Sequence, residues 1–274
     1  MNWPEPSRHP AAEAAARIRE VTDLRPDTAI VLGSGLGDAL VARIAEEASF
    51  AFTDLPGFPP PTVPGHAGHV ILGRLEGVPV AAFRGRIHFY EHHDMEWCSL
   101  TVRLARALGA ETAVVTAAVG GVAPACRPGS LVIVRDHVNL MGENPLAGWR
   151  FPDGSPAFVD LSGAYDPGLA ARAEAEAERL GIEATPGIYA AFRGPSFETG
   201  AEIAMLRTMG AAVVGMSMVP EVVAAHAQGM RVLGLAWVAN AAGVPVHHED
   251  VLAAGRRAAG DAGALIAAIL ARPT

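Results

Sequence analysis

Arginine, histidine and tyrosine alternate along FRGRIHFYEHHD, residues 83–94, which follows an apolar run typical of a buried strand. If the extended backbone of that strand continues, Arg86, His88 and Tyr90 project from one face of it. A guanidinium forms paired hydrogen bonds to an oxyanion, and an imidazole changes its charge near neutral pH. Together with the phenol, these side chains are suited to an oxyanion that is bound next to a sugar.

Metal binding is an alternative for the same segment. His88, His92 and His93 could act as ligands with Glu91 or Asp94, but their order fits no familiar ligand spacing and H-E-x-x-H is absent from the sequence. The two cysteines of the chain form no ligand cluster or paired framework either. We therefore expect no metal site, and we expect His92 and His93 to lie in a solvated surface turn.

A glycine-rich turn joins an expected strand to an expected helix in TAIVLGSGLGDAL, residues 28–40. Glycines let the backbone approach a ligand, and the N–H groups of a helix start attract anions, so a phosphate is the first interpretation. The dinucleotide fingerprint is incomplete because Asp38 occupies its last glycine position, although Asp54 lies about 20 residues on, where a ribose-binding acid is expected. A P-loop is excluded because the chain contains no lysine. A plain strand-to-helix turn is the alternative.

The segment GPSFETGAE, residues 194–202, combines a helix start with two conspicuous side chains. Thr199 and Glu202 have the spacing of a capping box, which gives Glu202 a structural role. Phe197 and Glu198 precede the helix and follow a Gly-Pro turn. An aromatic ring and a carboxylate suit a nitrogen heterocycle, which stacks on the ring and donates an N–H to the acid.

Other candidates stand in loops or at the ends of elements. His66 and His69 lie in the glycine-rich GHAGH, which is either a binding loop or a surface turn. Ser217 precedes a helix that has Pro220 in its first turn, so it either binds an anion or caps the helix. Asn240 ends an apolar strand, where its amide either binds a ligand or closes a turn.

Composition limits the classes of function. The chain has 274 residues, of which 50% are hydrophobic and 18% charged, so it can bury a large core. Its net charge of −8 disfavours nucleic acid as a partner. No apolar run is long enough to span a membrane, and the charged, helix-like N-terminus contains no signal peptide, so we expect a cytoplasmic protein. All 21 basic residues are arginines, which excludes Schiff-base chemistry.

Apolar strand-like runs alternate with helix-period segments along the whole chain, which predicts an α/β fold. The strands are apolar throughout, as expected where helices cover both faces of a largely parallel sheet. Strands are expected at 28–33, 69–75, 79–85, 112–120, 131–136, 187–192, 211–216 and 230–239. Helices are expected around 36–48, 95–108, 167–180, 200–209, 219–228 and 248–270. Two Pro- and Gly-rich stretches, 55–68 and 144–156, are long enough to be functional loops, and neither resembles a domain boundary.

Over residues 28–255 the order and spacing of several motifs resemble the trimeric purine nucleoside phosphorylases. The motifs are GSGLG, TVPGHAGHV, RGRIHFYE, VGGV, RDHVNLMGENPL, GPSFETGAE, VVGMSMVPEV and VANAAG. The resemblance implies a single α/β domain over residues 1–274, with a central mixed, largely parallel sheet flanked by helices. It also implies a homotrimer that cleaves purine nucleosides, with inorganic phosphate as co-substrate, to a free base and ribose 1-phosphate, and that needs no metal or organic cofactor.

The resemblance also assigns site residues by position. The implied phosphate ligands are Ser34, His66, Arg86, His88, the backbone N–H of Ala118, and Ser217. The implied ribose contacts are Tyr90, Met216 and His248, with Phe158 reaching into a neighbouring subunit's site. The implied base contacts are Phe197, Glu198, Val214 and Asn240. In this scheme the catalytic residues are His88, Glu198 and Asn240, and the pair Glu198 and Asn240 predicts 6-oxopurines such as those of inosine and guanosine.

The chain departs from the family pattern at three places that bear on base preference and efficiency. Ala117 stands where an asparagine is usual, Ala239 replaces a threonine, and Arg193 replaces a small apolar residue. Two alternative functions follow from the resemblance. One is a 5′-methylthioadenosine phosphorylase, against which Asn240 and His248 both argue, and the other is a catalytically weak nucleoside-binding homologue. A third alternative, a cofactor-binding oxidoreductase, is supported by the glycine turn alone.

Overall fold

The structure, a computed structural model, describes residues 9–60, 62–63, 67–92, 94–151, 153–244 and 248–271. The strands are β1 (Thr28–Leu32), β2 (Ala45–Ala51), β3 (His69–Leu75), β4 (Val78–Arg84), β5 (Thr112–Gly121), β6 (Leu131–Asn139), β7 (Ala184–Ala191), β8 (Val213–Gly215) and β9 (Arg231–Ala241). The helices are α1 (Pro10–Arg19), α2 (Gly37–Val41), α3 (Phe89–His92), α4 (Leu100–Leu108), α5 (Pro167–Leu180), α6 (Gly200–Thr208), α7 (Val219–Ala227) and α8 (His248–Leu270), with short 3₁₀ helices at η1 (Phe52–Asp54) and η2 (Trp97–Ser99).

Within the described residues, the strands form one mixed sheet in the order β2-β3-β4-β1-β5-β8-β7-β6-β9. Strand β1 pairs in parallel with β4 and β5, and β5 pairs in parallel with β9. Because β9 also pairs with β6, the strands β5, β8, β7, β6 and β9 form a closed ring of pairings. The predicted α/β fold with a mixed, largely parallel sheet is confirmed.

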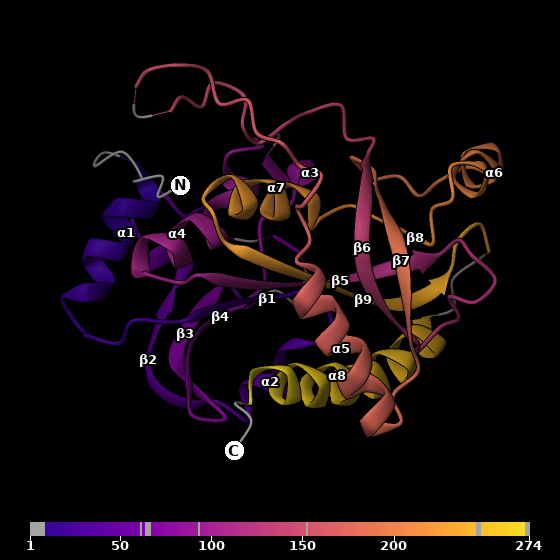
Figure 1. Ribbon diagram of the computed structural model, residues 1–274, viewed down its shortest axis with the longest axis horizontal. Helices are drawn as coiled ribbons and strands as arrows, with labels where there is room; N and C mark the ends of the chain where they lie inside the picture. The colour runs from indigo at the N-terminus through magenta and orange to yellow at the C-terminus, as the bar shows by residue number, and fades with distance from the viewer. Residues whose placement is uncertain are drawn as a thin grey trace.

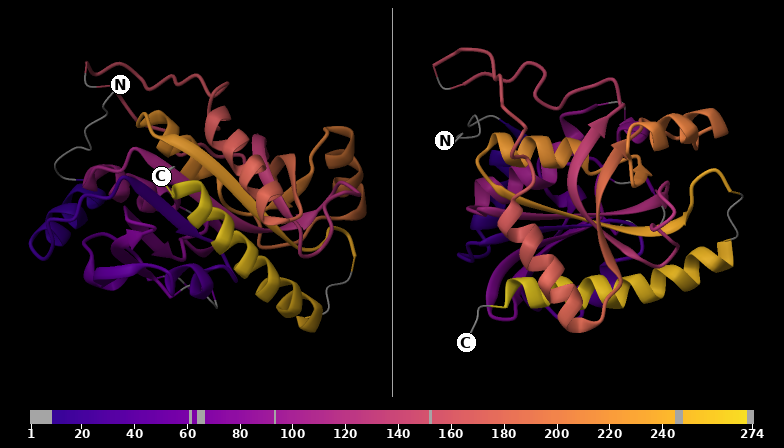
Figure 2. Two further views of the ribbon diagram at one scale, coloured as in Figure 1. Left: turned by 60° about the horizontal axis from the view of Figure 1, so that its bottom comes forward. Right: turned by 45° about the vertical axis from the view of Figure 1, so that its right-hand side comes forward.

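Helices cover both faces of the sheet, which explains why a central strand such as β1 is apolar and buried (Figures 1 and 2). The residues of β1 are all buried, and they alternate between the two cores. Ala29 and Val31 pack with residues of α1, α4 and α7. Ile30 and Leu32 pack with residues of α2, α5 and α8 on the opposite face.

One predicted helix is wrong in its second half. The helix expected around residues 36–48 ends at Val41, and the following residues form the edge strand β2, which pairs antiparallel with β3. A side chain at Gly73 of β3 would place its Cβ 2.3 Å from the carbonyl oxygen of Ala45, so this close pairing depends on glycine. Charged Glu46 and Glu47 are exposed on β2, as is common on an edge strand.

A long segment between β6 and α5, residues 140–166 and here named the arm, projects from the body of the molecule (Figure 1, top). It contains the predicted functional loop 144–156. In the part of the arm that the structure describes, the one β-bridge outside the named strands joins Arg150 to Pro156. The other predicted loop, 55–68, is described except at residues 61 and 64–66.

Candidate active site

A cavity of about 810 Å³ opens where several strands of the sheet end. The parallel strands β4, β1, β5 and β9 have their carboxyl ends at the same edge, where ligands of open α/β sheets usually bind. The predicted site residues that line this cavity are Ser34, Arg86, His88, Tyr90, Ala118, Phe197, Glu198, Val214, Met216, Ser217 and Asn240. They come from segments far apart in the sequence, and the fold brings them together.

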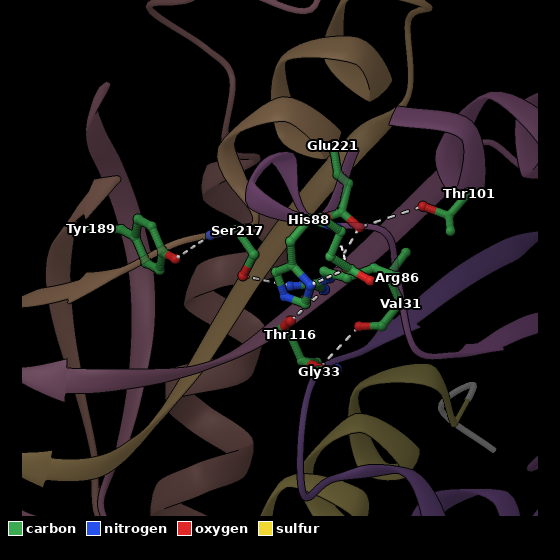
Figure 3. A network of polar contacts seen from close by, with 10 residues as sticks. Val31, Gly33, Arg86, His88, Thr101, Thr116, Tyr189, Ser217 and Glu221 are labelled. Carbon is green, nitrogen blue, oxygen red and sulfur yellow. Dashed lines mark hydrogen bonds and ion pairs between the residues drawn. The ribbon is translucent and has the colours of Figure 1, made fainter. Parts of the chain in front are cut away.

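Arg86 is the buried cation of the cavity, with 1% of the residue exposed. Its Nη1 donates to Ser217 Oγ at 2.9 Å, and its Nη2 donates to the carbonyl oxygen of Thr116 at 2.6 Å. Its Nε lies 3.2 Å from Oε1 of Glu221, and the two side chains are each 2% exposed (Figure 3). Burial raises the pKa of Glu221 to about 7, although the charge of Arg86 opposes that shift.

His88 is oriented by Glu91, an acid in the short helix α3 that follows it. Its Nδ1 lies 2.9 Å from Glu91 Oε1, and the same oxygen accepts the backbone N–H of His88 at 2.7 Å. Burial lowers the pKa of His88, and its hydrogen bond to Glu91 acts against that shift. Burial tends to raise the pKa of Glu91, but hydrogen bonds from His88 and Thr62 hold it well below its usual range. Because the ionised Glu91 can only accept, the proton of neutral His88 is on Nδ1, which leaves Nε2 as an acceptor.

The row of Arg86, His88 and Tyr90 is not built as the sequence predicted. Strand β4 ends at Arg84, and Tyr90 lies in the short helix α3, so the extended backbone does not continue. All three side chains nevertheless line the cavity. The rings of His88 and Tyr90 are stacked, with centroids 4.8 Å apart and planes 15° apart.

The glycine turn after β1 is tied to the neighbouring strands. The backbone N–H of Gly33 donates to Thr116 Oγ1 at 2.9 Å, and that hydroxyl donates to the carbonyl oxygen of Val31 at 2.9 Å (Figure 3). A Cβ at Gly33 would lie 2.9 Å from the carbonyl oxygen of Thr116, so the turn approaches β5 more closely than a side chain allows. Trp237 Nε1 donates to the carbonyl oxygen of Ser34 at 3.0 Å. These bonds hold the backbone of the turn against the cavity.

Asp38, the acid that interrupts the dinucleotide fingerprint, forms an ion pair with Arg84. It is not among the described residues that line the cavity. The carboxylate of Asp38 is therefore paired within the protein, at the position where the dinucleotide fingerprint requires a glycine or alanine.

Ser217 lies in the turn between β8 and α7. Its backbone N–H donates to the hydroxyl of the buried Tyr189 at 3.3 Å, while its side chain accepts from Arg86. The next residue, Met218, has a positive φ of 65°, a backbone conformation that is uncommon outside glycine. Pro220 lies in the first turn of α7, as the sequence predicted.

Glu198 and Asn240 lie on the side of the cavity that the sequence assigns to a heterocycle. Burial raises the pKa of Glu198, and the charge of Glu202 contributes to the rise. The capping box is confirmed, because Thr199 and Glu202 exchange side-chain to backbone hydrogen bonds of 2.7 and 3.2 Å. Asn240 Nδ2 donates to the carbonyl oxygen of Ala241 at 3.0 Å. Phe197 is 76% exposed at the cavity.

Three predicted site residues are not brought to the cavity by the described structure. Phe158 lies on the arm, 87% exposed, and does not line the cavity. His66 lies outside the described residues, and His248 begins α8 but its side chain is not described. The alternative candidate His69 places its Nδ1 2.8 Å from the carbonyl oxygen of Ala67.

Residues that the sequence analysis missed include Glu91, Thr116 and Glu221, which support the cavity-lining side chains. Thr116 and Glu221 are each flanked on both sides by apolar residues, and a polar residue within such a run is the signal that was available in the sequence. In the described part of the chain, the structure contains no group of three or more His, Cys, Asp or Glu side chains arranged to hold a metal ion. None of the described helices is both long and apolar enough to cross a membrane.

Residues 27–271 match the family described as the phosphorylase superfamily. The chain is 47% identical over 243 residues to purine nucleoside phosphorylase 1 of Bacillus subtilis, which covers 87% of this chain and 89% of the relative. It is similar to the crystal structure of a schistosoma purine nucleoside phosphorylase in complex with hypoxanthine, with a TM-score of 0.88, 33% identity, and 96% and 97% of the two chains covered. A Schistosoma mansoni structure in complex with adenosine has a TM-score of 0.87, with 33% identity and the same coverage. The chain belongs to the phosphorylase superfamily and, within it, to the purine nucleoside phosphorylases, so the resemblance seen in its motifs is confirmed.

Proposed function

We propose that the protein catalyses the phosphorolysis of purine ribonucleosides and deoxyribonucleosides, and that it prefers inosine and guanosine. The products are the free purine and (deoxy)ribose 1-phosphate, and inorganic phosphate is the co-substrate. The observation that carries the proposal is that one cavity is lined both by Arg86, His88 and Ser217 and by Glu198 and Asn240. The reaction of this proposal uses no metal or organic cofactor.

The phosphate subsite of this proposal is the buried end of the cavity around Arg86. Its other ligands are Ser34, His88, the backbone N–H of Ala118, Ser217 and His66, of which His66 lies outside the described residues. A guanidinium that is shielded from water binds a dianion strongly, because the local dielectric is low. The Nε2 acceptor of neutral His88 is suited to a monohydrogen phosphate, which still carries one O–H donor.

Catalysis follows from where charge develops. As an oxygen of phosphate approaches C1′ of the ribose, the C1′–N9 bond breaks, and its electron pair moves into the purine. The ribose becomes positive and is stabilised by the bound phosphate dianion, and the negative purine is stabilised by hydrogen bonds at its far side. Both interactions strengthen as the bond opens, which is the condition for lowering the barrier.

The base subsite gives the preference for 6-oxopurines. Glu198 accepts the N1–H that hypoxanthine and guanine carry and neutral adenine lacks, and Asn240 bonds to N7 and O6 as charge or a proton arrives there. Phe197 and Val214 pack against the ring. An adenine would leave the carboxylate of Glu198 without a donor, and a site built around such a bond discriminates strongly.

The ribose subsite and the assembly complete the proposal. Tyr90 and Met216 line the cavity between the phosphate and base subsites, and His248 is assigned to the 5′-hydroxyl. The assembly is a homotrimer, in which Phe158 of one subunit reaches the ribose of the next. Its support is that Phe158 is a largely exposed aromatic side chain on a projecting arm. We assign residues 1–274 to one domain, and the two free cysteines agree with a cytoplasmic location.

The test is inosine turnover with and without phosphate, followed by chromatography for hypoxanthine, with adenosine run in parallel. We expect hypoxanthine only when phosphate is present, and little adenine. If adenine is released from adenosine at a comparable rate and only with phosphate, the proposed phosphorolysis stands, but the roles of Glu198 and Asn240 in base preference are contradicted. No product from either nucleoside, with guanosine still bound, would favour the nucleoside-binding homologue.

A further inference from the structure

The guanidinium of Arg86 is held by groups from different parts of the fold. Ser217 precedes α7, Thr116 lies in β5, and Glu221 lies in the first turn of α7 (Figure 3). Two of these contacts are to neutral oxygen atoms, and the third is to a carboxylate. The orientation of the guanidinium plane is therefore set by the protein before any ligand arrives.

Glu221 is the unusual member of this group. It is fully buried, and Thr101 Oγ1 of α4 lies 3.4 Å from its Oε1. Its Oε2 has no hydrogen-bond partner among the described residues. A buried carboxylate with so few donors is costly to ionise unless a cation lies against it, and Arg86 is the cation that does so.

Glu221 does not touch the space that a substrate would occupy. Arg86 and Ser217 are among the described residues that line the cavity, and Glu221 is not. Among its contacts in the described structure, the ion pair with Arg86 is the one that links Glu221 to a cavity-lining side chain. Its position on α7 also connects that guanidinium to the helix whose preceding turn carries Ser217.

We propose that Glu221 is a positioning residue of the phosphate subsite, which holds the guanidinium of Arg86 in the orientation in which it lines the cavity. The inference rests on the proposed function, because it takes phosphate to be the anion that Arg86 binds. What matters in this role is an oxygen atom packed against the guanidinium, 3.2 Å from Nε, and the negative charge is secondary. Two substitutions separate these properties.

The substitution Glu221→Gln keeps an oxygen at the same distance and removes the charge, whereas Glu221→Asp keeps the charge and withdraws it by one methylene. We expect Glu221→Asp to raise the KM for phosphate by about tenfold, because the 3.2 Å contact between the carboxylate and the guanidinium of Arg86 is lost or lengthened. We expect Glu221→Gln to stay within about threefold of the wild-type KM for phosphate, because the amide oxygen keeps the place of Oε1 against the guanidinium. The KM for inosine should change by less than about twofold in both variants, since neither touches the base subsite.

The matched control is Glu96, which pairs with the buried Arg103 at 3.1 Å away from the cavity. Glu96→Asp alters an ion pair that also has a buried arginine but a half-exposed glutamate, and we expect it to leave the KM for phosphate unchanged. The opposite pattern, a wild-type KM in Glu221→Asp and a large rise in Glu221→Gln, would overturn the positioning role and assign the effect to charge. Equal rises in KM for phosphate and for inosine would also overturn it, because they indicate general damage to the site.

The wild-type protein separates this inference from the proposed function. If the wild type releases hypoxanthine only with phosphate, the proposed function stands, and the variants test Glu221 alone. If the wild type shows no dependence on phosphate, the proposed function fails, and the role assigned to Glu221 fails with it.

Discussion

At the scale of single residues, Glu198 can accept the N–H of the proposed base, but its partial burial opposes the ionised form that accepts. The carboxylate must be ionised to accept an N–H, but its partial burial favours the protonated form and raises its pKa. Binding of a 6-oxopurine should therefore weaken at a higher pH than it would if Glu198 were fully exposed.

This sensitivity gives a pH prediction. As the pH falls through the raised pKa of Glu198, the acceptor is lost, so kcat/KM for inosine should fall at a higher pH than an ordinary glutamate would produce. In Glu198→Gln the group no longer titrates, so the fall of kcat/KM at low pH, the acid limb of the profile, should disappear. At pH values where Glu198 of the wild type is ionised, kcat/KM of the variant should be lower by about 100-fold. The measurement is kcat/KM against pH for both proteins.

Glu202→Gln serves as the control, because it removes the neighbouring charge that contributes to the raised pKa of Glu198. The acid limb should remain in this variant and move to lower pH. An acid limb that is unchanged in Glu198→Gln would show that another group titrates, and would contradict the role of Glu198.

At the scale of elements, Arg193 connects the arm to the helix that carries Tyr90. Its Nε donates to the carbonyl oxygen of Met141 at 3.1 Å, and its Nη2 lies 3.5 Å from Glu143 Oε1, both at the base of the arm. Its guanidinium carbon lies 4.9 Å from the ring centroid of Phe89 in α3. The residue that departs from the family pattern thus joins the arm, the end of β7 and α3.

We expect Arg193→Ala to loosen the arm, because it removes the contacts that tie residues 141 and 143 to the body of the protein. Trypsin should then cleave after Arg150, which is exposed in the arm, several-fold faster, on the order of the change that a lost hydrogen bond of ~1 kcal/mol produces. The cleavage rate is followed by mass spectrometry under native conditions. Arg179→Ala, which removes an exposed ion pair on α5, should leave the rate unchanged, and an equal rate in Arg193→Ala would contradict the connection.

At the scale of the whole molecule, the arm carries an exposed phenylalanine that does not line the cavity. In the proposed trimer, Phe158 completes the ribose subsite of a neighbour. Neither Phe158→Ala nor Arg86→Ala trimers should then be fully active, but for different reasons, since one lacks the donated ring and the other lacks its own phosphate ligand.

Mixing the two variants tests this arrangement. After subunit exchange, an Arg86→Ala subunit donates its intact Phe158 to a neighbouring Phe158→Ala subunit, whose own Arg86 is intact. We expect activity to rise above the mean of the separate variants, up to about a quarter of wild type if assembly is random. Light scattering measures the assembly in parallel. A monomer, or a mixture whose activity equals that mean, would contradict the shared site.

The class of fold and most of the site were predictable from the sequence. Apolar runs such as TAIVLG directly indicate a strand that is buried on both faces. The motifs around Arg86, Glu198 and Ser217 are each short, so their functional side chains lie within a few residues of one another in the sequence. The helix expected over 36–48 was partly wrong because pairing with β3 outweighed local helical preference at the sheet edge. Arg86, His88 and Tyr90 were grouped because a continuing strand would place them on one face. In the structure the strand ends at Arg84, and a turn and a short helix bring the three side chains to the cavity.

By itself, the sequence determined the α/β class, because that class follows from local periodicity, and the order of its motifs implied the family and most of the residues that line the cavity. Only the tertiary structure decided that Glu221 lies against Arg86, that Thr116 ties the glycine turn to β5, and that Arg193 joins the arm to α3. Such contacts join residues that are far apart along the chain. Their partners are chosen by how strands and helices pack, and no local pattern of the sequence contains that information.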